Sequence, residues 1–201
     1  MSELHPPVYF LRHGQTDWNL EGLIQGTIDT PLNDTGLAQA KALGRALADV
    51  PGLARGFQFF VSPLRRARQT MDHIASALGL AADGIGVAAD LRELGFGVWE
   101  GKPFWELKAS SDYPADGRSR YSWRPEDGES YADGRERMGR WLDRLRGPAV
   151  VVSHGAIGRC LLAHLCDLAP HEVVNLEMPQ GRYCRIEGGH ATWFDAMEIA
   201  A

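Results

Sequence analysis

Two histidines in the sequence follow apolar runs typical of β-strands, and each of them precedes a glycine. His13 follows a run that begins at Val8, and His154 follows a run that begins at Ala149. In parallel α/β sheets, ligands bind at the carboxyl ends of the strands. Gly155 opens a predicted helix, whose N-terminus favours an anion. We therefore expect both histidines at one anion-binding site.

Side chains suited to phosphate chemistry occur in two further segments. Arg65, Arg66 and Arg68 lie at the start of a predicted helix, where cations oppose the helix dipole but can hold a phosphate bidentately. Glu93 lies in a glycine-rich apolar loop, surroundings that favour the protonated carboxyl of a general acid. Each feature alone is weak evidence. Together with two histidines, they predict a dianion pocket with a nucleophile and an acid.

Other polar residues have simpler interpretations. His164 and His171 lack the spacing of a metal-binding helix, so we expect no metal ion and no cofactor. Arg135, Arg137 and Arg140 are expected to form a solvated face of a helix.

The elements that position these residues alternate between strands and helices. Strands are expected at 8–11, 57–61, 149–152, 183–186 and 191–194, with an edge strand near Val87. Helices are expected after Asn33, Ser62, Ser130 and His154, with the first three as N-caps and Pro63 in the first helical position. This alternation predicts a three-layer α/β/α fold with a largely parallel central sheet.

The chain length of 201 residues predicts a single domain spanning 1–201. Residues 102–129 carry three prolines and are expected to form an irregular insertion that covers the site. The insertion contains Trp105, Tyr113, Tyr121 and Trp123. Their rings either form a wall over the leaving group or pack the insertion down, and packing is the simpler interpretation.

Charge and cysteine usage limit the class of protein. The net charge of −5 argues against nucleic acid as a partner. The three cysteines show no disulfide or zinc spacing, which favours a reducing compartment. The sequence shows neither a signal peptide nor an apolar run of membrane-spanning length. We therefore expect a soluble cytoplasmic protein with no membrane partner.

Several motifs, in order, resemble the signature of the histidine phosphatase superfamily, which has the phosphoglycerate mutase-like fold. The motifs are L-R-H-G-Q-T-D-W-N at 11–19, S-P-L-R-R-A-R-Q-T at 62–70, R-E-L-G-F-G-V-W-E-G at 92–101, G-E-S at 128–130 and V-S-H-G at 152–155. The resemblance extends from Val8 to about Ile186. Gln15 stands where the family more often has glutamate.

The resemblance implies a role for each matched residue. His13 would be the nucleophile that becomes phosphohistidine. Arg12, Arg66 and His154 would hold the phosphoryl group. Glu93 would be the general acid on the leaving oxygen and then the base for water.

Asn19 and Gln25 match family positions that contact phosphate or substrate, and we group Gly155 with them. The implied activity is hydrolysis of a small phosphorylated metabolite, a phosphomonoester, through a phosphohistidine intermediate. Phosphoryl transfer depends mainly on positioning and charge neutralisation, which these residue types supply.

Two alternatives remain beside a phosphatase. The family's phosphoglycerate mutases usually carry an adjacent arginine pair in the insertion, whereas Arg118, Arg120 and Arg124 are not adjacent, which favours a phosphatase. A phosphate-binding module without turnover would need the arginines but neither His13 nor Glu93.

Overall fold

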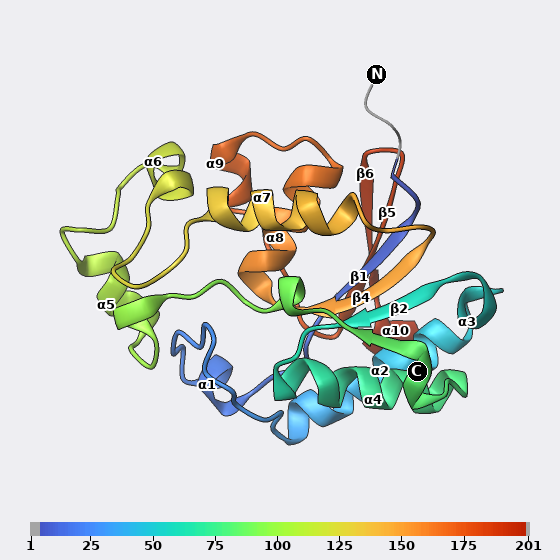
Figure 1. The fold of residues 1–201 in the computed structure, drawn as a ribbon. Coiled ribbons are helices and arrows are strands. Elements are labelled where there is room, and N and C mark those ends of the chain that lie inside the picture. The colour runs from blue at the N-terminus through green and yellow to red at the C-terminus, as the bar shows by residue number, and fades with distance from the viewer. Residues whose placement is uncertain (1–4, 200–201) are drawn as a thin grey trace.

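The computed structural model describes residues 5–199 (Figure 1), and within them the strands form a six-stranded sheet in the order β3-β2-β4-β1-β5-β6. The parallel strands are β1 (Val8–Arg12), β2 (Gln58–Val61), β3 (Ile85–Val87) and β4 (Ala149–Ser153). At the β1 edge, β5 (Arg182–Glu187) and β6 (His190–Asp195) add an antiparallel hairpin. The predicted largely parallel sheet, terminal hairpin and edge strand near Val87 are confirmed.

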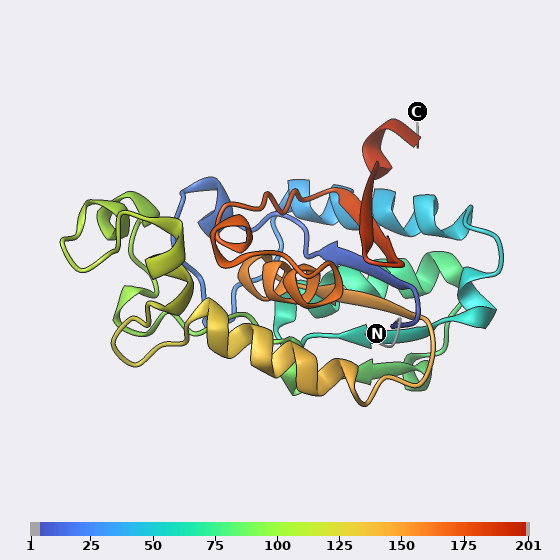
Figure 2. The same ribbon diagram turned by 90° about the horizontal axis from the view of Figure 1, so that it is seen from above.

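Helices cover both faces of the sheet (Figures 1 and 2). One face carries α2 (Asp34–Ala48), α3 (Leu53–Gly56), α4 (Arg65–Leu78) and α10 (Ala196–Ile199). The other face carries α7 (Tyr131–Leu142) and α8 (Gly155–Leu165), with α9 (Pro170–Val173) beside them. Short 3-10 turns occupy Ala82–Gly84, Ala89–Leu91 and Gly97–Trp99. The fold therefore has the expected three layers.

The central strands are buried on both faces because their side chains alternate between two cores. Val8 and Phe10 of β1 contribute to the core under α7 and α8. Tyr9 and Leu11 point the other way, into the core under α2 and α4. Burial on both faces explains why the central strands read as continuous apolar runs in the sequence.

Two of the three predicted helix caps are confirmed. The Asn33 side chain accepts a hydrogen bond from Gly36 N at 2.9 Å, and Ser130 forms a capping box with Asp133 at the start of α7. The prediction for Ser62 is wrong, because Leu64 is the N-cap and α4 begins at Arg65. The Ser62 hydroxyl instead lies 2.6 Å from His154 Nε2, so this serine belongs to the histidine cluster.

Segment 102–129 is more regular than expected. It contains α5 (Phe104–Ala109) and α6 (Gly117–Ser122), and both lie beyond the end of the sheet in Figures 1 and 2. The Asp116 side chain caps α6 by accepting from Ser119 N at 2.9 Å. The prolines thus separate short helices instead of preventing them. None of the helices within residues 5–199 has the length and apolar character that crossing a membrane requires.

The loop after β1 is held tightly against the first turn of α2. Asn33 N donates to Gln15 O at 3.0 Å, and the short α1 (Asp17–Leu20) follows this loop. A Cβ atom on Gly36 would lie 2.0 Å from Gln15 O, so only glycine permits this approach. The contact fixes the backbone that continues from His13.

We predict that Gly36→Ala destabilises the fold by about 1–3 kcal/mol, the cost of forcing atoms into a packed contact. Gly56→Ala is the matched control, because a Cβ there meets nothing within 4 Å. Urea denaturation of both variants measures the difference. Equal stabilities for the two variants would show that the contact between the loop and α2 is not tight.

Candidate active site

Strand pairing brings three distant segments together at the carboxyl edge of the sheet. Arg12 is in register with Ser153 across β1 and β4, and His13 N donates to Ser153 O at 2.9 Å. On the other side of β4, Ser62 N donates to Val152 O at 3.1 Å. The rings of His13 and His154 are consequently 5.1 Å apart, centroid to centroid.

The hydrogen bonds of His13 determine which ring nitrogen is free to react. Nδ1 lies 2.7 Å from Gly14 O, and a carbonyl oxygen can only accept, so Nδ1 carries the proton. Arg66 Nε, which can only donate, lies 3.3 Å from Nε2. Nε2 therefore carries the lone pair. The arrangement presents His13 as a neutral imidazole with Nε2 as its nucleophilic atom.

Burial keeps both histidines neutral. His13 is 2 % exposed and His154 is fully buried. Desolvation lowers the pKa of each well below 6.5, and the neighbouring charges of Arg66 and Arg12 lower both further. A neutral His13 retains its nucleophilic lone pair down to mildly acidic pH.

His154 is fixed at one nitrogen and unpaired at the other. Its Nε2 is hydrogen-bonded to Ser62 Oγ, while its buried Nδ1 has no partner among residues 5–199. If the Ser62 hydroxyl donates to Nε2, the ring proton lies on Nδ1 and is available to an oxygen of a bound anion. An unpaired buried polar atom carries a free-energy cost that a ligand can relieve.

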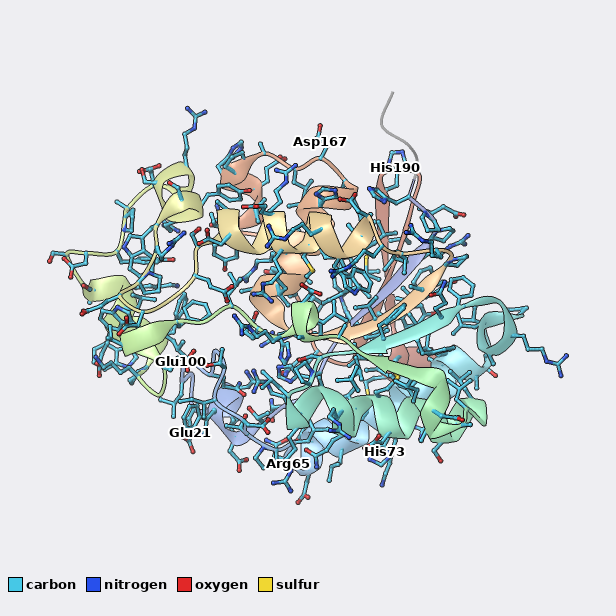
Figure 3. All side chains as sticks on the ribbon, viewed as in Figure 1. Glu21, Arg65, His73, Glu100, Asp167 and His190 are labelled. Carbon is cyan, nitrogen blue, oxygen red and sulfur yellow. The ribbon has the colours of Figure 1, made fainter. Side chains whose placement is uncertain are left out.

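Arg66 is the arginine of the α4 start that reaches the site. It is fully buried, and its Nη1 and Nη2 donate to the carbonyl oxygens of Ile28 and Gly26 at 2.7 and 2.8 Å. Desolvation lowers the pKa of Arg66 to about 10, so it stays charged at neutral pH. Arg65 and Arg68 are exposed, and Figure 3 shows Arg65 at the outer edge of the molecule.

Arg12 supplies a second cation beside His13. Its Nη1 donates to Met178 O at 2.9 Å, and its buried Nε has no partner in the described part of the chain. Desolvation lowers the Arg12 pKa, and the charge of Glu93 opposes this shift. Gly155 lies against this guanidinium, since a Cβ there would be 3.6 Å from its Cζ.

Glu93 is held at the N-terminus of α8 by backbone donors. Its carboxylate accepts from the N–H groups of Ala156 at 3.1 Å, Ile157 at 2.9 Å and Leu94 at 3.0 Å. These surroundings differ from the apolar loop expected from the sequence, because three N–H donors stabilise a negative charge. The sequence hides them, since two of the three belong to a helix far along the chain.

Asn19 and Gln25 each offer their amide N–H groups to a ligand. The Asn19 side-chain oxygen accepts from Gln180 Nε2 at 2.9 Å, and the Gln25 oxygen accepts from Thr30 Oγ1 at 2.6 Å. Neither amide nitrogen has a hydrogen-bond partner within residues 5–199. Two more donors are thus free for an anion.

These groups surround one cavity of about 230 Å³. Its lining includes seven of the eight predicted site residues, namely Arg12, His13, Asn19, Gln25, Arg66, Glu93 and Gly155. His154 is not part of the lining and contacts the cavity through His13. The lining also includes Arg159, so three arginines oppose one carboxylate and the cavity favours an anion.

The structure adds positioning residues that the sequence patterns missed. Arg137 was expected on a solvated helix face, but it is 8 % exposed and donates to the carbonyls of Asp90 and Arg92 at 2.7 and 2.8 Å. It therefore fixes the loop that carries Glu93. Gln180 donates to His13 O at 3.2 Å as well as to Asn19. Both residues act over long sequence separations, which local patterns do not reveal.

Within the described residues, no group of three or more His, Cys, Asp or Glu side chains is placed to hold a metal ion. The positive charge of the cavity comes from arginines and from backbone N–H groups. The site lies at the carboxyl edge of the parallel strands in a three-layer α/β fold. A buried neutral histidine beside several arginines is typical of proteins that act on phosphate groups.

Comparisons with known proteins agree with this class. The model of the histidine phosphatase superfamily (branch 1) matches residues 8–196. Fructose-2,6-bisphosphatase TIGAR B from Danio rerio is 40 % identical over 196 residues, which cover 90 % of this chain and 72 % of the relative. A Yersinia enterocolitica protein named probable phosphoglycerate mutase GpmB is 32 % identical over 205 residues, covering 92 % and 86 %.

A solved structure of similar fold is mycobacterial glucosyl-3-phosphoglycerate phosphatase. It has a TM-score of 0.76 and 28 % identity, and the match covers 91 % of this chain and 90 % of that one. The chain belongs to the histidine phosphatase superfamily. It is an enzyme of the phosphatase and phosphoglycerate mutase-like type, and its relatives support hydrolysis of small phosphorylated metabolites through phosphohistidine.

We predict that the folded state loses stability as the pH falls below about 6.5. The unfolded chain binds protons at His13 and His154 near pH 6.5, but the folded chain binds them only at lower pH. The free energy of unfolding should therefore fall by up to about 1.4 kcal/mol per pH unit for each histidine, until the folded pKa is reached.

Urea denaturation between pH 6.5 and about pH 5 tests this expectation. His13→Asn should reduce the slope of stability against pH. His190→Asn, which changes an exposed histidine, should keep the wild-type slope. Identical slopes for all three proteins would contradict the buried neutral state of His13.

Proposed function

We propose that this protein hydrolyses phosphomonoesters through a phosphohistidine formed at His13. The observation that carries the proposal is the His13 Nε2 lone pair, which lies 3.3 Å from Arg66 Nε in a cavity with excess positive charge. A neutral nucleophile beside cations suits attack on a phosphate dianion. The substrate is a small phosphorylated metabolite, not a nucleic acid or a membrane.

The first half-reaction transfers the phosphoryl group to the enzyme. Nε2 of His13 attacks phosphorus, and the bond from phosphorus to the leaving oxygen breaks. Arg12 and Arg66 neutralise charge on the phosphoryl oxygens, and His154, beside His13 but outside the cavity lining, would donate its Nδ1 proton to one of them. Glu93 donates a proton to the departing alcohol.

The second half-reaction returns the enzyme to its starting state. Water attacks phosphorus while the Glu93 carboxylate accepts its proton. The bond between phosphorus and Nε2 breaks, and His13 is restored as a neutral imidazole when phosphate leaves. Asn19 and Gln25 would donate amide N–H groups to the phosphoryl or substrate oxygens, and Gly155 allows close approach to Arg12.

Hydrolysis is favoured over return of the phosphoryl group to substrate by the state of the arginines in segment 102–129. Arg124 pairs with Asp133 at 2.6 Å, and Arg120 donates to the carbonyls of Pro114 and Ala115. Neither lines the cavity at His13. The pair of free arginines that grips a substrate carboxylate in the family's mutases is thus missing from this segment.

We further propose that residues 1–201 form one histidine phosphatase domain, with segment 102–129 inserted over the site. The residues that match the family model, 8–196, include segment 102–129. Free thiols at Cys160, Cys166 and Cys184 are in keeping with a cytoplasmic, reducing environment.

We predict that His13→Ala abolishes phosphate release from p-nitrophenyl phosphate and the acid-labile phosphoryl adduct, because the nucleophile is absent. Arg66→Ala should lower kcat by about 10³-fold or more, as other transition-state arginines do. Arg65→Ala is the matched control, since this exposed neighbour lies outside the cavity. Steady-state rates and rapid quench measure both effects. Near-wild-type kcat in His13→Ala would exclude His13 as nucleophile.

We predict that Glu93→Gln slows phosphorylation of the enzyme by alkyl phosphates by about 10²–10⁴-fold, the effect of losing a general acid. The same variant should affect p-nitrophenyl phosphate much less, because its leaving group departs without a proton. Pre-steady-state bursts separate this step from later hydrolysis, in which Glu93 is the base. An equal fall in the burst rates of both substrates would make Glu93 a binding residue.

A further inference from the structure

A second cavity adjoins the one that contains His13. It has a volume of about 290 Å³ and lies between segment 102–129 and the main fold. The two cavities share three lining residues, Phe96, Phe104 and Arg159. The two cavities therefore lie next to each other, with these three side chains between them.

Five aromatic side chains line the second cavity, together with the cations Lys108, Arg120 and Arg159. Tyr113 and Trp123 of segment 102–129 pack edge to face, with ring centroids 5.2 Å apart, and both line it. Tyr131 closes the wall on the side of α7, and the shared Phe96 and Phe104 form its boundary with the first cavity. Five rings thus meet around one space, and flat rings stack well against such walls.

The aromatic residues of segment 102–129 divide into two groups. Tyr113 and Trp123 line the cavity, whereas Trp105 is 68 % exposed and Tyr121 lies elsewhere, next to α7. Tyr113 and Trp123 pack against each other and both line the cavity, whereas a role over the leaving group stays a prediction. Trp105 provides a natural control for Trp123.

Polar groups in the cavity suit a ring that carries hydrogen-bond acceptors. The indole N–H of Trp123 and the hydroxyl of Tyr113 have no hydrogen-bond partner within residues 5–199. The acid in the lining, Glu129, is already bound by Arg137 at 3.0 Å and by Gly95 N at 2.9 Å. The cavity therefore offers free hydrogen-bond donors, its one carboxylate is neutralised by Arg137, and the cations in its lining leave it positively charged.

We propose that the second cavity binds the leaving group of the substrate, and that the preferred substrates are phosphomonoesters whose alcohol carries an aromatic or heteroaromatic ring. The inference rests on the proposed function, because it takes the phosphoryl group to be at His13. Ring binding in the second cavity orients the scissile bond toward Nε2 and the leaving oxygen toward Glu93. A leaving group without a ring does not fill the second cavity, which then contains water.

Three primary alkyl phosphates with matched chemistry test the proposal in the wild-type protein: ethyl, 2-cyclohexylethyl and 2-phenylethyl phosphate. Each leaves as a primary alcohol that needs a proton from Glu93, so differences in kcat/KM report on binding of the organic group. We expect 2-phenylethyl phosphate to exceed the cyclohexyl ester by about 2- to 13-fold, the contribution of aromatic contacts beyond burial. The ethyl ester should be slower than either.

Two tryptophan variants then locate the effect. Trp123→Leu should reduce the kcat/KM advantage of the phenyl ester over the cyclohexyl ester. Trp105→Leu should preserve the wild-type order. Hydrolysis of ethyl phosphate by Trp123→Leu shows that this variant is folded. If the variant does not fold, the comparison of the three esters in the wild-type protein still tests ring selectivity.

The outcomes separate this inference from the proposed function. Equal kcat/KM values for the phenyl and cyclohexyl esters would overturn ring selectivity, and equal values for all three would overturn the role of the cavity. In both cases, turnover that depends on His13 would leave the phosphatase proposal intact. Hydrolysis of none of the three esters, or of p-nitrophenyl phosphate, would overturn both.

Discussion

The parallel pairing of β1 with β4 is the constraint on which the site depends. It places Arg12 beside Ser153, so the segments that follow β1 and β4 leave the sheet side by side. The rings of His13 and His154 are therefore close to each other. The bond from His13 N to Ser153 O continues the pairing one residue past the strand. Because β2 pairs with the other edge of β4, Ser62 and the start of α4 arrive at the same point. A shift of one residue in either register would separate these groups.

The site keeps its positive charge because neutral groups satisfy its cations. Arg66 donates to two backbone carbonyls and Arg12 to a third, and within residues 5–199 no carboxylate lies at hydrogen-bonding distance from either guanidinium. Burying such charges costs free energy, and the same burial drives protons from His13 and His154. One desolvated environment thus accounts for both the excess positive charge and the neutral imidazole of His13. A phosphate dianion supplies the missing countercharge.

The two cavities are built from different parts of the fold. The phosphate cavity is built on strand ends and helix starts, with Glu93 fixed by the first turn of α8 and its loop fixed by Arg137. The second cavity depends on segment 102–129, whose short helices lie outside the layered core (Figure 1). Under the two proposals, strand ends and helix starts hold the phosphate, and segment 102–129 contacts the alcohol.

The sequence by itself determined the layers and the chemical residue types, because strand and helix periodicity, the Asn33 and Ser130 caps and the His-Gly turns are local signals. The charge pattern alone does not distinguish Arg65, Arg66 and Arg68. Only the family motif predicted that Arg66 is the arginine that binds phosphate. Tertiary structure decided what depends on distant partners. Ser62 turned from a helix cap into a partner of His154, Arg137 from a surface residue into a support for the Glu93 loop, and segment 102–129 into one wall of a cavity. Hydrogen bonds and burial between segments far apart in the chain set these roles, and no local pattern encodes such contacts.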